Sequence, residues 1–149
     1  MKNRVFNERG LTLIELLAVL VILGIISAIA VVSIVNLVNK SRDQAMVANA
    51  IALRDSAIYY VKDQLLNSNV VGTQISYETL YNENFIETIK DPDTGEILNP
   101  ETNESYVVVN GETITAVCFK GAERNLCSND GEEPAIPIAE LSTSLITKN

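Results

Sequence analysis

The sequence is poor in the residue types that most enzymes use. Its 149 residues include no histidine, no tryptophan and only two cysteines. Without histidine the usual general base is missing, and two thiols are too few soft ligands for a zinc site. No serine or cysteine lies in a recognisable nucleophile motif, and there is no glycine-rich phosphate loop. We therefore expect a non-enzymatic protein without a resident cofactor, subject to one calcium candidate considered below.

Positive charge is scarce as well. The chain has 11 basic and 19 acidic residues, a formal net charge of −8. Three of the basic residues and one of the acidic ones lie in residues 1–10, so the remainder carries −10. Nucleic-acid binding needs basic patches, so this balance argues against direct binding of DNA or RNA by the single chain.

Charge is absent altogether from Leu16 to Asn39, and proline is absent from Leu11 to Leu66, where Gly24 is the only glycine. About 20 apolar residues cross a bilayer, so this run predicts a single membrane-spanning helix that continues beyond the membrane. The basic residues that precede it favour a cytoplasmic N-terminus and an outward-facing C-terminal part.

Glu15 lies near the start of this apolar run. A carboxylate within a bilayer is costly, about 2.5–3.5 kcal/mol at the centre on insertion scales, and its presence suggests a function. The alternative is a side chain that extends to the lipid headgroups and has no further role.

The residues around Glu15 favour a function. Gly10 followed by Leu11-Thr12-Leu13-Ile14-Glu15 resembles the class III leader of type IV prepilins and pseudopilins. The resemblance implies that prepilin peptidase cuts between Gly10 and Leu11 and that the new amine of Leu11 is methylated. It also implies that Glu15 pairs with this amine in a neighbouring subunit, with Thr12 in the same assembly motif. A buried carboxylate needs such a partner.

Two positions depart from the family pattern. Leu11 replaces the usual phenylalanine or methionine, an apolar exchange with which we expect processing to survive. Val32 stands where the family often has a proline, and its presence favours a straighter helix.

Gly24 and Ala28 lie four residues apart, a spacing at which small residues let helices approach closely. We expect them to assist assembly, although a routine anchor also tolerates such a glycine. Two further alternatives remain. One is a conventional secretory signal cleaved near Ala28-Ile29-Ala30, and the other is an uncleaved membrane anchor.

Residues 40–66 regain charges while apolar residues recur with helical spacing, which predicts an amphipathic helix packed on the rest of the chain. The stripe expected to be buried consists of Ala45, Ala48, Ile51, Ala52, Ile58, Tyr59 and Leu65. Asn67-Ser68-Asn69 should end this helix, and Ser76 should cap a short second one.

Residues 90–104 are rich in turn formers and contain Asp91, Asp93 and Glu96. Clustered carboxylates are candidates for a calcium site, but the spacing does not match the EF-hand loop. A turn that begins with aspartate and proline explains the same residues.

Asn110-Gly111 separates two β-rich runs and predicts a hairpin. A two-residue turn would place Val109 opposite Glu112 and Val107 opposite Ile114. The face expected to pack on the helix then consists of Val107, Ile114, Ala116 and Cys118.

Cys118 and Cys127 are predicted to lie outside the cell, where a disulfide is the simplest expectation and a reduced buried pair is the alternative. Many pilins have a disulfide-bounded loop near the C-terminus, so the placement is similar. In the tail, residues 128–149, Pro134 and Pro137 disfavour regular structure. The tail's apolar residues could add an edge strand, and a partly mobile tail is equally compatible.

The expected fold class is α+β. A long N-terminal helix, membrane-spanning in its first half and amphipathic in its second, packs on a small antiparallel sheet in a pilin-like arrangement. The expected parts are a cleaved leader (1–10), a transmembrane or filament-core helix (11–39), an amphipathic helix (40–66) and an extracytoplasmic head with its tail (67–149).

We expect a pilin, a structural subunit of a type IV pilus-like filament with roles in adhesion, motility or DNA uptake. The alternatives are a type II secretion pseudopilin and a single-pass or secreted domain that does not assemble. The resemblance implies a homo-oligomeric filament, prepilin peptidase, an assembly platform with a cytoplasmic ATPase, and membrane lipid as partners. It also implies storage in the cytoplasmic membrane before assembly and a cell-surface filament afterwards.

Overall fold

The computed structural model describes residues 8–127 and 135–149, with side chains from Thr12 onward. Helix α1 (Glu8–Leu66) passes through two compact units, Met1–Lys40 and Ser41–Asn149. The other elements are β1 (Gln74–Ser76), α2 (Tyr77–Asn82), β2 (Tyr106–Asn110), β3 (Thr113–Lys120), β4 (Arg124–Leu126), β5 (Ile136–Pro137), the short 3-10 helices η1 (Ile138–Glu140) and η2 (Thr143–Leu145), and β6 (Thr147–Lys148). The α+β class, with a long helix and a small antiparallel sheet, is confirmed.

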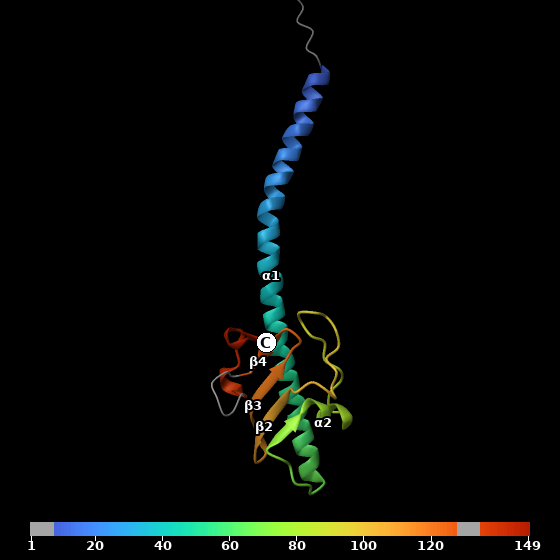
Figure 1. Cartoon of the computed structure of the whole chain (residues 1–149), viewed down its shortest axis with the longest axis vertical. Helices are drawn as coiled ribbons and strands as arrows, with labels where there is room; N and C mark the ends of the chain where they lie inside the picture. Colours follow the sequence, from blue (N-terminus) through green and yellow to red (C-terminus); the bar gives the residue numbers. More distant parts are fainter. Residues whose placement is uncertain (1–7, 128–134) are drawn as a thin grey trace, which may run out of the picture. The chain divides into compact units, whose positions relative to one another are not determined.

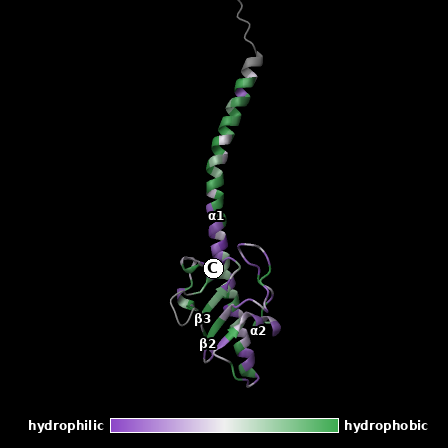
Figure 2. Ribbon diagram, viewed as in Figure 1, coloured by the Kyte–Doolittle hydropathy of each residue, from purple (hydrophilic) through white to green (hydrophobic). Residues whose placement is uncertain are grey.

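In the first unit the described residues, 8–40, are all helical. Its apolar side chains are exposed on every face, and Figure 2 shows the mainly hydrophobic colouring of this part of α1. By length and composition α1 is the one helix among the described residues that could cross a membrane. The helix begins at Glu8, so the last residues of the expected leader have helical backbone.

The second unit packs its sheet on the C-terminal part of α1 (Figure 1). The strands run antiparallel in the order β1-β2-β3-β4-β6, and β5 also pairs with β3. The side chains that α1 buries against the sheet are Met46, Ala50, Leu53, Ala57 and Val61. They recur every three or four residues and therefore line one face of the helix.

The prediction of which face of α1 is buried is wrong. Of the seven residues in the expected stripe, only Ile58 is half-buried, and Tyr59 is 66% exposed. The reason is that this part of α1 has two apolar faces, and periodicity alone does not decide which one meets the sheet. Contact with the sheet buries the face of Met46, Leu53 and Val61 and leaves the opposite face, with Tyr59, exposed.

Local signals at the ends of helices are confirmed. Ser76 caps α2, because its hydroxyl accepts a hydrogen bond from the backbone N–H of Thr79. Helix α1 ends with Ser68 in the left-handed region, at φ 58°. The N–H groups of Ser68 and Asn69 bond the carbonyls of Leu65 and Gln64, which is the Schellman arrangement.

The predicted hairpin forms, but its register is wrong. Val109 pairs with Ile114 and Asn110 with Thr113, so the turn residues are Gly111 and Glu112. Gly111 has a φ of 64° while Asn110 stays in the ordinary region. Positive φ at the first turn position alone is typical of a type II′ turn, whereas the predicted type I′ turn needs it at both.

The inner face predicted for the hairpin is wrong at two of its four residues, Ala116 and Cys118. Val108 pairs with Ala116 although Val109 pairs with Ile114, so Thr115 is an extra residue and forms a β-bulge. Beyond the bulge the alternation is reversed. Val117 and Phe119 join Val107 and Ile114 in the main core, whereas Ala116 and Cys118 lie in a second cluster.

The described part of the tail is structured. Strand β5 pairs with β3, and β6 pairs with β4. Pro137 lies within β5. Proline has no N–H to donate to a neighbouring strand, so it is restricted to short or peripheral strands such as this one. Pro134 lies outside the described residues.

Candidate functional site

The expected processing and assembly residues lie at the start of α1. Gly10 and Leu11 have helical backbone, and Glu15 follows Leu11 by four residues, which is about one turn of helix. The side chain of Glu15 is exposed and has no hydrogen-bond or ion-pair partner among the described residues. Its neighbours Leu13 and Ile14 are exposed apolar residues. A carboxylate in such surroundings needs a cation from outside the chain once water is removed.

Gly24 and Ala28 also lie on the exposed helix. A Cβ added at Gly24 would meet no atom within 4 Å. The fold of the chain therefore does not require glycine at this position, and a steric reason for it would have to come from another helix.

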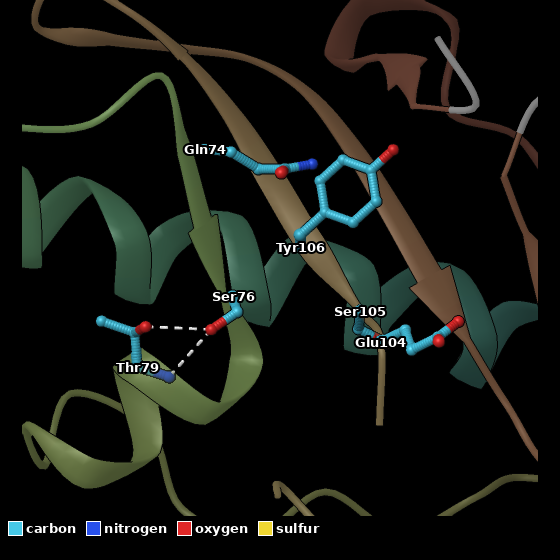
Figure 3. A pocket seen from close by; sticks show the side chains of 6 residues that line it. All are labelled: Gln74, Ser76, Thr79, Glu104, Ser105 and Tyr106. Carbon is cyan, nitrogen blue, oxygen red and sulfur yellow. Dashed lines mark hydrogen bonds between the residues drawn. The ribbon is translucent and has the colours of Figure 1, made fainter. Parts of the chain in front are cut away.

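A shallow groove lies on the outer side of the sheet, at its β1 edge (Figure 3). Its volume is about 320 Å³, and its lining residues are Gln74, Ser76, Thr79, Glu104, Ser105 and Tyr106. Ser76 and Tyr106 are opposite each other in the β1–β2 register. Sequence analysis missed this groove, because its residues come from segments that only the sheet brings together.

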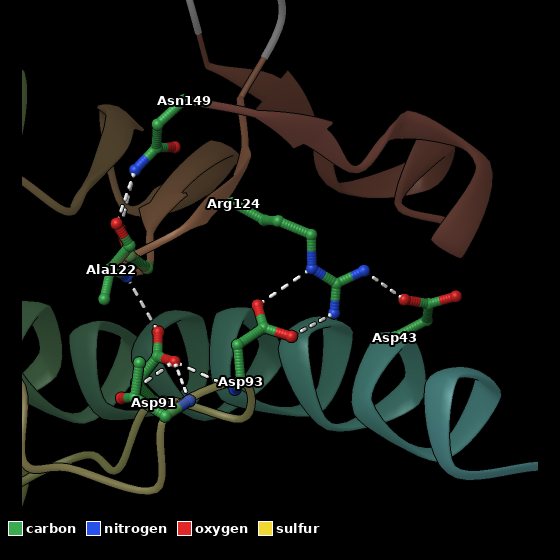
Figure 4. Close-up of polar contacts among 8 residues, drawn as sticks. Asp43, Asp91, Asp93, Ala122, Arg124 and Asn149 are labelled. Atoms are coloured by element: carbon green, nitrogen blue, oxygen red, sulfur yellow. Dashed lines mark hydrogen bonds and ion pairs between the residues drawn. The ribbon is translucent and has the colours of Figure 1, made fainter. Parts of the chain in front are cut away.

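A second polar site joins three segments of the head through Arg124 (Figure 4). The guanidinium donates from Nε and Nη2 to the two carboxylate oxygens of Asp93, each at 2.8 Å, and from Nη1 to Asp43 on α1. These hydrogen bonds to Asp93 and Asp43 raise the pKa of Arg124, so it stays charged. The side chain of Asp93 is only 7% exposed, which strengthens a bidentate pair of this kind.

Asp91 lies beside this pair and is buried. Its Oδ1 accepts hydrogen bonds from the N–H groups of Asp93 and Thr94 and from the Thr94 hydroxyl, and its Oδ2 accepts one from the N–H of Ala122 at 2.8 Å. Burial alone would raise the pKa of Asp91. The hydrogen bonds from Ala122, Thr94 and Asp93 outweigh burial and lower it.

These contacts bear on the calcium candidate Asp91, Asp93 and Glu96. The oxygens of Asp91 face N–H donors, those of Asp93 face Arg124, and Glu96 is exposed. Within residues 8–127 and 135–149, no three or more acidic or thiol side chains are grouped so as to hold a metal ion. The structure therefore places the carboxylates of Asp91 and Asp93 beside protein donors, and Glu96 does not join them.

Gly121 is a residue that sequence analysis did not single out. A Cβ there would lie 2.7 Å from both the carbonyl oxygen of Arg124 and Oδ2 of Asp91, and 3.1 Å from Cε of Met46. Only glycine fits this close approach. In the sequence, the only indication of this close approach was a glycine directly after the predicted strand that ends near Lys120.

Cys118 and Cys127 form a disulfide that closes the loop between β3 and β4. Both cysteines are buried on the outer side of the sheet, where Tyr106, Val108 and Ala116 pack on them. The bond thus holds the segment that carries Gly121 and Arg124.

Comparison with known proteins gives one family finding. Residues 6–31 match the prokaryotic N-terminal methylation motif. No curated protein and no solved structure matches the chain. The motif is the class III leader of type IV pilins and pseudopilins, as the sequence predicted. This motif supports a precursor of the type IV pilin or pseudopilin type.

The motif implies processing by prepilin peptidase and assembly into a pilus-like filament. The motif and the apolar helix fit a membrane-anchored pilin that is assembled outside the cell later.

Proposed function

We propose that this chain is a structural subunit of a type IV pilus-like filament on the cell surface. After cleavage between Gly10 and Leu11 and methylation of Leu11, α1 joins the core of the filament and the heads face outward. The observation that carries the proposal is the exposed apolar helix with the unpartnered Glu15, which bears the methylation motif.

The energetics of the helix support assembly. Burying one exposed leucine or isoleucine gives about 1.5–3 kcal/mol, so the first unit of α1 is stable only in lipid or against other apolar helices. Within a fibre, the methylated amine of Leu11 is a cation of the kind that Glu15 needs. We propose that this pair sets the axial register between subunits.

Features of the head favour a pilus subunit over a secretion pseudopilin. Secretion pseudopilins tend to have a calcium-binding loop and often lack a disulfide, whereas this chain joins Cys118 to Cys127. In the corresponding loop Arg124 supplies the positive charge beside Asp93. We therefore propose a subunit that has no catalytic role and needs no calcium, with adhesion, motility or DNA uptake as the roles of its filament.

The test is the intact mass of the native protein in material sheared from cells, compared with the membrane fraction. We expect a chain that begins at methylated Leu11 and is abundant in the sheared material. A Leu11 start confined to membranes would favour a pseudopilin. A start at Val31, or an intact leader, would contradict the filament function.

A matched pair of variants tests assembly separately from folding. Glu15→Ala should remove the chain from the sheared fraction while the membrane fraction retains it. Glu78→Ala, which alters an exposed carboxylate on α2, should leave both fractions unchanged. Normal filaments from Glu15→Ala cells would refute the role of Glu15.

A further inference from the structure

The groove beside β1 is lined on one side by the aromatic ring of Tyr106. Tyr106 alternates with the buried Val107 along β2, so its ring lies on the outer face of the sheet. The ring packs on the cluster of Cys118, Cys127 and Ala135, and Cys118 is its partner in the register. The disulfide thus lies beside Tyr106 on the same face of the sheet.

Polar groups of different kinds surround this ring. Gln74 and Ser76 alternate with the buried Ile75, so both project to the same outer face as Tyr106. Figure 3 shows the Gln74 amide reaching over β2 toward Tyr106. The Gln74 side chain has no hydrogen bond within the described part of the chain, so its donor and its acceptor are available to a ligand.

The other rim consists of hydroxyls and a carboxylate. The hydroxyls of Ser76 and Thr79 lie 2.9 Å apart and hydrogen-bond each other. Glu104 is paired through Oε2 with Lys120, and this bond lowers the pKa of Glu104. Oε1 of the carboxylate remains as an acceptor at the edge of the groove.

The lining selects among ligand classes. An apolar peptide would leave the amide, carboxylate and hydroxyl groups without partners. An anion would meet Glu104 on a head of strong negative charge, and a cation would compete with Lys120 for the same carboxylate. A neutral sugar fits best, because its C–H face can lie on an aromatic ring while its hydroxyls bond planar amides and carboxylates.

We propose that the groove lined by Gln74, Glu104 and Tyr106 binds one unit of a neutral saccharide. Tyr106 provides the stacking surface, Gln74 bonds two ring hydroxyls, and Oε1 of Glu104 accepts from a third. The volume of about 320 Å³ suits one or two sugar rings and an open, exchangeable site. The proposal concerns the folded head and does not depend on filament formation.

The test is saturation-transfer NMR on the full chain in zwitterionic micelles, which contain no sugar. The probes are methyl β-D-glucoside, methyl β-D-galactoside and methyl N-acetyl-β-D-glucosaminide, with methyl β-D-glucuronide as the anionic comparison. We expect transfer to the ring protons of at least one neutral glycoside, concentrated on one face of the sugar. The glucuronide should bind more weakly than the glucoside, because Glu104 repels its carboxylate.

Variants locate the binding. Tyr106→Ala and Gln74→Ala should each weaken it by about tenfold or more, and Tyr106→Phe should retain most of it because the ring remains. Tyr81→Ala removes an exposed tyrosine on α2 that lies outside this groove, and it should change nothing. Gln74 is exposed, so its variant is informative even if Tyr106→Ala disturbs the fold.

Two results would overturn the proposal. One is the absence of transfer to all three neutral glycosides with the folded wild-type chain. The other is transfer that persists unchanged in Gln74→Ala and Tyr106→Ala, which would place the sugar elsewhere. Neither result would affect the filament proposal, whose readout is the N-terminus and its cellular fraction.

Discussion

Arg124 and Asp93 form a bidentate pair with two hydrogen bonds of 2.8 Å, although 31 residues separate them in the chain. The pair links the disulfide-bounded loop to the segment around residues 89–98, and the bond from Arg124 to Asp43 extends the link to α1. One guanidinium therefore holds together three segments that share no strand pairing with one another.

Replacing Arg124 by glutamine should destabilise the head by about 2–3 kcal/mol, because a nearly buried carboxylate at Asp93 would lose its charged partner. Urea unfolding of the full chain in micelles measures this free energy. The matched control is Lys120→Gln, which breaks the exposed pair with Glu104 and should cost less than about 1 kcal/mol. Equal effects of the two variants would contradict the clamp role of Arg124.

Asp91 should make the head sensitive to acid. Its pKa is lowered in the folded state, so its contribution to stability is present above the unfolded pKa of about 3.9 and is lost as the pH falls through the lower folded value. The free energy of unfolding should therefore drop below about pH 4.

The measurement is a set of urea curves between neutral pH and pH 3. Asp91→Asn should show a smaller decrease than the wild type over the acid range, because the titrating group is absent. Glu78→Gln, an exposed replacement of the same chemistry, should follow the wild-type curve. A wild-type slope in Asp91→Asn would exclude Asp91 as the source.

Gly121→Ala should destabilise the head by about 1–3 kcal/mol, since its Cβ would lie 2.7 Å from two oxygen atoms. Gly72→Ala is the control, because the nearest atom to its Cβ would be at 3.6 Å and its φ is not in the left-handed region. It should change stability by less than about 0.5 kcal/mol. Thermal unfolding by circular dichroism distinguishes the two.

Removing the disulfide with the double change Cys118→Ala and Cys127→Ala should lower the free energy of unfolding by about 2–3 kcal/mol. This is the effect expected for a bond between cysteines that are 9 residues apart in the sequence. Alanine avoids placing a hydroxyl in the buried cluster. Addition of reductant should lower the stability of the wild type toward that of the variant and leave the variant unchanged. A reductant effect on the variant would point to another cause.

Local features of the fold could be predicted from the sequence. The Ser76 cap, the end of α1 and the hairpin around Gly111 depend on residues close together in the chain. The disulfide also follows from a short loop and an oxidising compartment. The methylation motif is local too, and it was predicted in full.

Features that depend on tertiary packing could not be predicted. Two apolar faces alternate along α1 between Ala45 and Val61, and only contact with the sheet shows which is buried. The clamp of Asp43, Asp93 and Arg124 was invisible for a related reason, because isolated charges separated by up to 81 residues resemble solvated ones. The groove residues Gln74 and Tyr106 become neighbours only through strand pairing.

The bulge at Thr115 affects how β3 tolerates change in sequence length. Deletion of Thr115 would remove the bulge and leave Ile114, Ala116 and Val117 in regular alternation, so Ile114, Val117 and Phe119 would all keep facing the core. Substitution at this exposed position changes a surface side chain and its 3.4 Å hydrogen bond to the carbonyl oxygen of Val108. Loss of residue 115 should therefore be tolerated in related genes, whereas one further residue inserted at this point would turn Val117 and Phe119 away from the core.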